Sequence, residues 1–193
     1  MQALKDAIIQ YGTAIAPDIV KVDMFLNHRI DTKLMAEMGS ELAAFFSAEA
    51  PDIILTVEAS GIALAMATAQ AMGHLPVVFA KKSATVVQSG NVAQAPVYSF
   101  THKSQNVIRI DKRYIPEGSR VLIVDDFLSD GQAVEGMMML CEQVNAKVIG
   151  IGIAIEKGFM QGGRKLRERN IKLKSLAIVQ SVKGGTLTLS EDC

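Results

Sequence analysis

Apolar residues along this chain form two alternating patterns, short continuous runs and longer stretches with helical spacing. The continuous runs are residues 53–57, 76–80, 121–124 and 148–155. Such runs, rich in valine and isoleucine, are typical of strands covered on both faces. The stretches with helical spacing are residues 34–46, 63–72 and 134–144. The alternation predicts an α/β fold in which a mostly parallel sheet is flanked by helices.

The run 121–124 leads into two adjacent carboxylates, Asp125 and Asp126, and then into a small glycine-containing turn. The turn consists of Ser129, Asp130, Gly131, Gln132 and Ala133. Backbone N–H groups at the start of the helix that follows suit a phosphate. The two carboxylates can accept hydrogen bonds from vicinal sugar hydroxyls or lie beside a divalent cation. The pattern indicates a site for a phosphorylated sugar, and a strand that ends in solvated acids is the alternative.

This order of strand, acid pair and glycine turn resembles the phosphoribosyl-diphosphate signature of the type I phosphoribosyltransferases. The resemblance implies that Asp125 and Asp126 are catalytic and face the ribose hydroxyls and a magnesium-bound diphosphate. It implies that residues 129–133 wrap the 5-phosphate. It also implies the fold of that family, with a small N-terminal hood and a mobile hairpin loop, Mg²⁺ as cofactor and a homodimer.

A second turn, formed by Ala59, Ser60 and Gly61 after the strand 53–57, resembles the diphosphate loop of the same family. Small residues there let the backbone approach an anion closely. Lys81 would stabilise the leaving diphosphate, although it stands where relatives carry arginine and so lacks the bidentate fork. Without the resemblance, these features are an ordinary strand-to-helix turn and a pair of solvated lysines, Lys81 and Lys82.

Between Lys82 and Pro116 the pattern loosens into short β-like pieces at 95–100 and 106–110. This arrangement favours a long mobile hairpin, and loops of this length are often functional lids. Residues 98–101 lie where related transferases carry a loop that closes over the diphosphate.

The strand 148–155 runs into Glu156, Lys157, Gly158 and Phe159. In purine phosphoribosyltransferases the loop after this strand holds the base. The resemblance therefore implies that Lys157 donates to the 6-oxygen and that Phe159 stacks on the ring. Lysine only donates, so it favours 6-oxopurines over adenine. The open alternative is that Lys157 is merely the solvent-exposed end of a strand.

The N-terminal stretch 20–30 narrows the resemblance to the branch of the family that acts on xanthine. Three further segments agree with it: Phe127-Leu128, Gly131-Gln132-Ala133 and Ile155-Glu156-Lys157. In that branch residues 1–35 would contribute a hood over the base, with Val20 and Asn27 contacting xanthine. The Asn27 amide can both donate and accept, whereas Val20 departs from an expected leucine. As an alternative, Asn27 is an N-cap or a turn residue before the helix that follows.

Two departures concern the phosphate turn. Ser129 stands where some 6-oxopurine transferases carry an aspartate base, and a serine cannot take a proton in the same way. Asp130 adds a negative charge beside a phosphate site. We expect it to point outward and cap the next helix.

Composition restricts the remaining possibilities. The chain has 193 residues and a formal net charge of zero, which suits one domain spanning 1–193. Its basic residues do not cluster on one helix, so we expect small-molecule substrates and no nucleic-acid partner. The group 164–169 is expected to be a solvated helix face, with a contact to diphosphate or to another subunit as the alternative. Two cysteines, no signal peptide and no apolar run near 20 residues suggest a cytoplasmic protein with no membrane partner.

The resemblance thus implies transfer of the phosphoribosyl group from 5-phosphoribosyl 1-diphosphate to N9 of xanthine in purine salvage. Two alternatives stay open. One is a transferase for guanine, hypoxanthine or adenine, which would differ only in its contacts to the base. The other is a non-catalytic purine regulator of the same fold.

Overall fold

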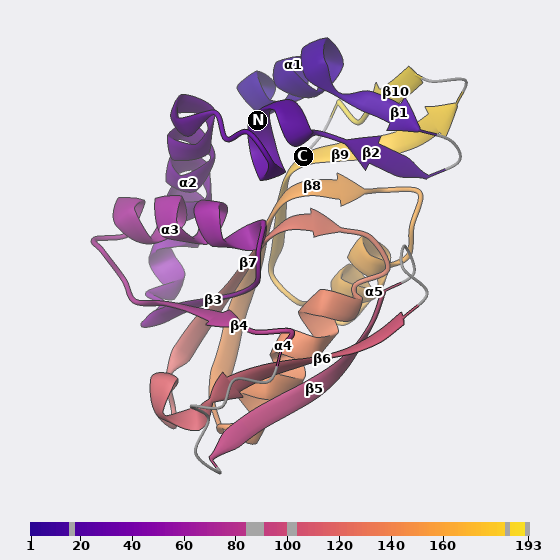
Figure 1. Cartoon of the computed structure of the whole chain (residues 1–193). Coiled ribbons are helices and arrows are strands. Elements are labelled where there is room, and N and C mark those ends of the chain that lie inside the picture. Colours follow the sequence, from indigo (N-terminus) through magenta and orange to yellow (C-terminus); the bar gives the residue numbers. More distant parts are fainter. Residues whose placement is uncertain (16–17, 84–90, 100–103, 184–185, 192–193) are drawn as a thin grey trace.

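A computed structural model describes residues 1–15, 18–83, 91–99, 104–183 and 186–191 (Figure 1). Its central sheet has the strand order β10-β9-β8-β7-β3-β4. The strands are β3 (Ile53–Val57), β4 (Val77–Ala80), β7 (Arg120–Leu128), β8 (Lys147–Lys157), β9 (Leu173–Lys183) and β10 (Thr186–Leu189). All neighbours are parallel except β9 and β10. The predicted mostly parallel sheet is confirmed.

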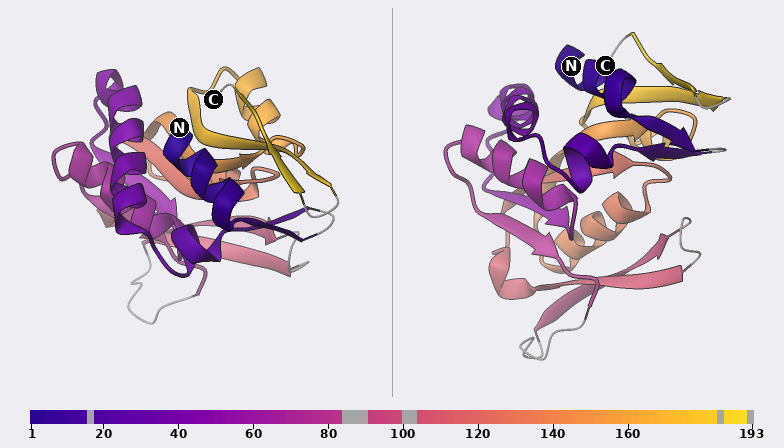
Figure 2. Two further views of the ribbon diagram at one scale, coloured as in Figure 1. Left: turned by 90° about the horizontal axis from the view of Figure 1, so that it is seen from above. Right: turned by 45° about the horizontal axis from the view of Figure 1, so that its top comes forward.

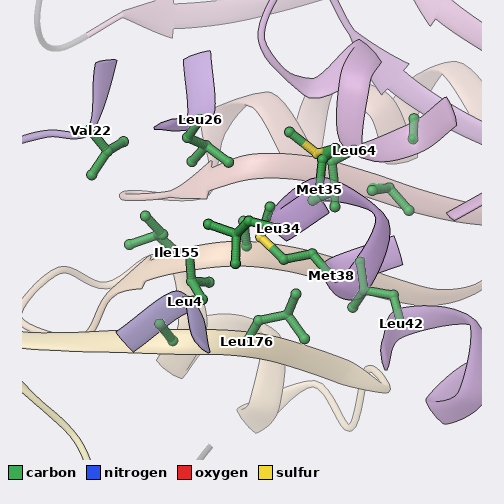
Figure 3. Packing of buried hydrophobic residues seen from close by; sticks show 14 of the residues in the cluster. Leu4, Val22, Leu26, Leu34, Met35, Met38, Leu42, Leu64, Ile155 and Leu176 are labelled. Atoms are coloured by element: carbon green, nitrogen blue, oxygen red, sulfur yellow. The ribbon is translucent and has the colours of Figure 1, made fainter. Parts of the chain in front are cut away.

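Helices cover both faces of this sheet (Figures 1 and 2). They are α1 (Gln2–Tyr11), α2 (Thr32–Phe46), α3 (Gly61–Ala71), α4 (Gln132–Gln143) and α5 (Gly162–Glu168), with short turns η2 (Ser47–Glu49) and η3 (Lys112–Tyr114). One buried cluster joins α1, α2 and α3 to the sheet, and Figure 3 shows Leu34 and Met38 of α2 near Ile155 and Leu176. A second cluster lies under α4 and α5. Burial on both faces explains why the strands are continuously apolar.

The helix α2 begins after Asp31, whose carboxylate accepts from the N–H groups of Lys33 and Leu34, both at 3.1 Å. Such a cap contributes about 1 kcal/mol to helix stability. The alternative that Asn27 caps this helix is therefore wrong. Asn27 instead ends a short π-helical turn, η1 (Asp23–Asn27).

The strand β7 is longer than the run 121–124 that predicts it. Only Val121 to Ile123 pair with β3, whereas pairing with β8 continues to Leu128. Asp125 and Asp126 therefore lie within the strand and not after it. They stay in it because β8 still pairs with β7 beyond the point where β3 has turned away into α3.

The two crossovers beside β7 leave in opposite directions. From β3 the chain passes through α3 to β4, and from β7 it passes through α4 to β8 on the other side. A crevice forms where strand order reverses in this way, at the carboxyl ends of the strands. This topology favours a ligand site at the carboxyl ends of β3 and β7, close to the acid pair.

Two smaller hairpins flank the sheet. β5 (Val92–Ser99) and β6 (Ser104–Asp111) form the predicted hairpin, which packs against α4. Residues 100 and 101 of the suggested closing loop lie outside the described residues. β1 (Thr13–Ile15) and β2 (Ile19–Lys21) form the other hairpin, near β9 and β10 (Figure 1). In the described part of the chain, no helix has the length and apolar character to cross a membrane.

Candidate active site

A cavity of about 640 Å³ lies at the carboxyl ends of β7 and β8. Its volume is in the range of small-molecule sites. Residues 127–134 form one part of its wall, and the hairpin β5–β6 contributes Val97, Tyr98, Asn106 and Ile108. The remaining lining residues are Asp18, Ile19, Val57, Lys82, Lys157 and Met160.

All five residues of the predicted phosphate turn, 129–133, line this cavity. Gly131 adopts φ +85° and immediately precedes α4. Glycine suits this position because a side chain is strained at positive φ. The turn therefore presents the N-terminus of a twelve-residue helix to the cavity, where its free N–H groups and dipole favour an anion.

Asp125 and Asp126 directly precede the wall segment 127–134 along the chain, but neither of them lines the cavity. Asp125 is 4% exposed and Asp126 is 8% exposed. The Asp126 N–H donates to Oδ1 of Asp125 at 3.0 Å. A Cβ atom placed on Gly61 would lie 2.5 Å from that same oxygen, so the end of the diphosphate turn packs directly on Asp125.

Burial raises the pKa of Asp125, and the adjacent charge of Asp126 raises it further, while Lys82 opposes the shift. Ionising Asp125 is therefore costly in the protein alone. A cation or hydroxyl donors brought by a ligand would reduce that cost. The buried hydroxyl of Thr56, which lacks a hydrogen-bond partner among the described residues, also lies beside Gly61.

The turn after β3 is joined to the end of β4. The N–H of Glu58 donates to the Ala80 carbonyl at 3.1 Å, and Oε1 of Glu58 accepts from the Lys82 N–H at 2.6 Å. Of the predicted turn residues Ala59, Ser60 and Gly61, none lines the cavity. Only Gly61 is placed against the acid pair.

The two lysines after β4 have different surroundings. Lys82 lines the cavity, whereas Lys81 exchanges backbone hydrogen bonds with Arg109 at 2.9 Å. The Lys81 Nζ lies 5.9 Å from the centre of the Phe79 ring. The sequence points to both lysines as cations at this edge and assigns Lys81 to the diphosphate, whereas the structure places Lys82 in the cavity wall. The adjacency of the two lysines was the available signal. Successive side chains of an extended segment point to opposite sides, so only one lysine of the pair can face the cavity.

Lys157 reaches the cavity from the end of β8, and its Nζ donates to the backbone carbonyl of Asp18 at 2.9 Å. Burial lowers the pKa of Lys157, and the charges of Asp18 and Asp130 oppose this shift. Asp130 thus lies on the cavity side, near Lys157. The expectation that Asp130 caps α4 is wrong, because Gly131 precedes that helix and no side chain caps it.

The predicted base contacts from the N-terminal segment do not line the cavity. Val20 is buried in the core, and Asn27 is exposed at the end of η1. Phe159, suggested as a stacking ring, is also exposed. Sequence reasoning missed Asp18, Ile19 and Met160 as lining residues and named Phe127 only as part of the resemblance. Their place depends on how β1–β2 and β8 meet, which no local pattern records.

Oxygen ligands for a hard divalent cation are available at the acid pair. Among the described residues, no group of three or more histidine, cysteine, aspartate or glutamate side chains could hold a metal ion. Two carboxylates fit Mg²⁺, which commonly binds one or two carboxylates together with substrate phosphates.

Comparisons with known proteins agree with this geometry. Residues 24–184 match the model of the phosphoribosyl transferase domain family. A xanthine phosphoribosyltransferase of Bacillus cytotoxicus is 47% identical over 188 residues, which are 97% of this chain and 95% of that protein. One of Clostridioides difficile is 44% identical over 187 residues, covering 97% and 98% of the two chains.

Solved structures show the same fold. The adenine phosphoribosyltransferase of Saccharomyces cerevisiae superposes with a TM-score of 0.71 at 26% identity, covering 91% of this chain and 97% of that one. The Giardia lamblia enzyme has a TM-score of 0.76 at 21% identity, covering 91% and 96%, and supports the fold alone. The chain belongs to the phosphoribosyltransferase family.

Proposed function

We propose that this protein is a xanthine phosphoribosyltransferase of purine salvage. It transfers the phosphoribosyl group of 5-phosphoribosyl 1-diphosphate to N9 of xanthine, giving xanthosine 5-phosphate and diphosphate. The observation that carries this proposal is a single cavity that joins the phosphate turn 129–133 to Lys157. The identity of 44–47% to xanthine phosphoribosyltransferases over almost the whole chain supports the choice of base.

The sugar diphosphate would lie along the edge formed by β3, β4 and β7. The turn 129–133 binds the 5-phosphate through its backbone N–H groups. Asp125 and Asp126 orient the ribose hydroxyls, and their negative charge stabilises the cation-like ribose as the bond from C1 to the diphosphate breaks. The turn of Ala59, Ser60 and Gly61 would receive the leaving diphosphate.

Positive charge would hold that leaving group. Mg²⁺, bound by diphosphate oxygens beside the acid pair, would neutralise the charge that develops on the leaving group. Lys81 and Lys82 are the lysines at this edge, and we extend the role first assigned to Lys81 to Lys82 because Lys82 lines the cavity.

The base would lie at the other end of the cavity, near Lys157. Its ammonium donates to the 6-oxygen, which adenine lacks. Val20 and Asn27 would contribute from the N-terminal hood of residues 1–35, with the Asn27 amide reaching the 2-oxo group. In the structure the Lys157 ammonium is held by the Asp18 carbonyl, so binding of the base exchanges one acceptor for another.

A direct assay separates the alternatives. The purified protein is incubated with 5-phosphoribosyl 1-diphosphate, Mg²⁺ and one of xanthine, guanine, hypoxanthine or adenine, and nucleotide formation is followed. We expect the highest kcat/KM with xanthine and almost no turnover with adenine. A preference for adenine would contradict the proposed role of Lys157. Binding of the sugar diphosphate without turnover of any base would instead favour a regulator.

We further propose a cytoplasmic homodimer. Large apolar side chains remain at least half exposed on α1, η1 and α3: Ile9, Tyr11, Met24 and Met66. A second copy would cover part of this surface, and sedimentation would detect twice the chain mass. Cys141 is a buried free cysteine, and burial raises the pKa of its thiol to about 12, so we expect this thiol to be unreactive.

A further inference from the structure

The side chain of Glu156 forms an ion pair that the reaction outlined above does not use. Glu156 precedes Lys157 at the end of β8 and is 3% exposed. Arg167 of α5 donates to its two carboxylate oxygens at 2.6 and 2.7 Å. Ser175 of β9 donates to Oε2 at 2.5 Å. A buried carboxylate is stable only when it is paired and hydrogen-bonded, so this one holds α5 against the sheet.

The first turn of α5 rests on this carboxylate. A Cβ atom on Gly163 would lie 1.9 Å from Oε1 of Glu156. Arg167 follows Gly163 by four residues and so lies on the same face of the helix, one turn further along. Its guanidinium therefore reaches the carboxylate from the side that glycine leaves open.

The same turn of α5 touches the phosphate turn. The Gly162 N–H donates to the Ser129 carbonyl at 2.9 Å. A Cβ atom on Gly162 would lie 2.4 Å from that carbonyl oxygen and 2.7 Å from the Gly131 nitrogen. The start of α5 is therefore packed between the Glu156 carboxylate and the backbone that would bind the 5-phosphate.

We propose that Glu156 and Arg167 are positioning residues for the phosphate turn. Their ion pair sets the position of Gly162, and Gly162 holds Ser129 and Gly131 where their backbone can converge on a phosphate. The inference rests on the proposed function, because it assigns the 5-phosphate to this turn. It adds an ion pair that supports binding of the sugar diphosphate and does not affect binding of the base.

Strand pairing explains why loss of the ion pair should not displace Lys157, which would bind the base. Glu156 is paired with Leu128 of β7 on one side and with Ile178 of β9 on the other. Lys157 is likewise paired with Val179. Loss of the Arg167 guanidinium would release α5 but leave the strand that carries Lys157 in place.

The test is the substitution Arg167→Met, which removes the guanidinium and keeps an unbranched side chain. We expect calorimetry to show about tenfold weaker binding of 5-phosphoribosyl 1-diphosphate with Mg²⁺. The KM for xanthine should stay within about twofold. Arg164→Met is the matched control, because Arg164 lies on the same helix and pairs with the exposed Glu168 at 3.8 Å. It should match the parent in both measurements.

Two further variants keep the proposal testable if Arg167→Met folds poorly. Arg167→Lys keeps the charge without the bidentate fork, so it should restore part of the sugar-diphosphate affinity. The double variant Glu156→Gln, Arg167→Met should lose little more affinity for the sugar diphosphate than the more affected of the two single variants, because the two residues act as a unit.

Unchanged sugar-diphosphate affinity in both Arg167 variants would overturn the proposal. So would an equal loss for sugar diphosphate and xanthine, which indicates general damage. A parent protein without turnover on xanthine would contradict the proposed function instead. The binding measurement would still decide whether Arg167 positions the phosphate turn.

Discussion

At Asp125 the requirements of stability and of chemistry oppose each other. Burial and the charge of Asp126 raise the pKa of this carboxyl in the folded protein, while an unfolded aspartate has a pKa of about 3.9. Between these two values the folded state binds more protons than the unfolded state. The free energy of unfolding therefore falls as the pH rises from the unfolded pKa toward the folded one.

Asp125→Asn should raise the stability of the protein at neutral pH and lower its activity. At about pH 3 the parent and the variant should melt at similar temperatures, because both carry a neutral group there. As the pH rises to about 7, the variant should become the more stable of the two. Its turnover should nevertheless fall by about a hundredfold, because the charge beside the ribose is lost. Melting curves at several pH values measure the stability difference, and steady-state kinetics measure the loss of turnover. A stability difference that does not change with pH would contradict the raised pKa of Asp125.

Lys157 and Asn27 should affect different properties of the enzyme. Lys157→Ala should lower kcat/KM with every 6-oxopurine by about 10- to 100-fold, since an acceptor on the base is left unpaired. Asn27→Ala should reduce only the preference for xanthine over hypoxanthine, which lacks the 2-oxo group. Lys165→Ala, at an exposed lysine of α5, is the control.

Kinetics with xanthine and hypoxanthine measure both effects. If the Asn27→Ala enzyme kept the parent's ratio of kcat/KM for xanthine to that for hypoxanthine, Asn27 would not contact the base. That result would direct attention to Asp18 and Ile19, which line the cavity from the same segment.

Among the elements, the hairpin β5–β6 depends on α4 for its position. The Gln143 amide pairs with the backbone of Gln94 on β5, accepting from its N–H at 3.1 Å and donating to its carbonyl at 2.9 Å. A side chain thus takes the place of a neighbouring strand at the edge of β5. The hairpin in turn supplies Val97 and Tyr98 to the cavity wall.

Gln143→Ala should loosen this hairpin. Loss of these hydrogen bonds is worth about 1 kcal/mol, so the Gln94 amide should exchange its hydrogen about fivefold faster. Gln70→Ala, at an exposed glutamine of α3, is the matched control and should leave this rate unchanged. Hydrogen exchange resolved by residue makes the comparison, and equal rates in the two variants would mean that Gln143 does not support β5.

The charged segment 164–169 is only in part the solvated helix face that its sequence predicts. Its charges predict a solvated helix face, and this holds for Arg164, which pairs with Glu168 at the surface. Arg167 instead reaches the buried Glu156, and Arg169 pairs with Glu135 of α4. The available signal was Glu156, an acid that directly follows the apolar run 148–155 within β8, since a buried carboxylate requires a partner.

For the whole molecule, the metal should matter for the reaction and not for the fold. Removal of Mg²⁺ with a chelator should abolish turnover, and added Mg²⁺ should restore it. The melting temperature of the ligand-free protein should not change, because no group of three candidate metal ligands exists in the described ranges of the chain. With the sugar diphosphate present, Mg²⁺ should raise the melting temperature. A large shift by Mg²⁺ alone would contradict a metal that arrives with the substrate.

Features carried by consecutive residues were determined by the sequence itself. Continuous apolar runs predict the buried strands, because both faces of each strand need apolar cover. The acid pair and the turn 129–133 are likewise local, since strand, turn and helix follow one another along the chain. These segments predicted the parallel sheet, the helices α2, α3 and α4, and the edge at which the cavity lies.

Contacts between distant segments were decided only by the tertiary structure. Lys82 faces the cavity while Lys81 pairs with Arg109, and Asp18 meets Lys157 across 139 positions of sequence. The ion pair of Glu156 with Arg167 and the contact of Gly162 with Ser129 are of the same kind. Each depends on the side to which a chain segment turns and on how two elements pack, and these are properties of the whole packed core that no local pattern of residues contains.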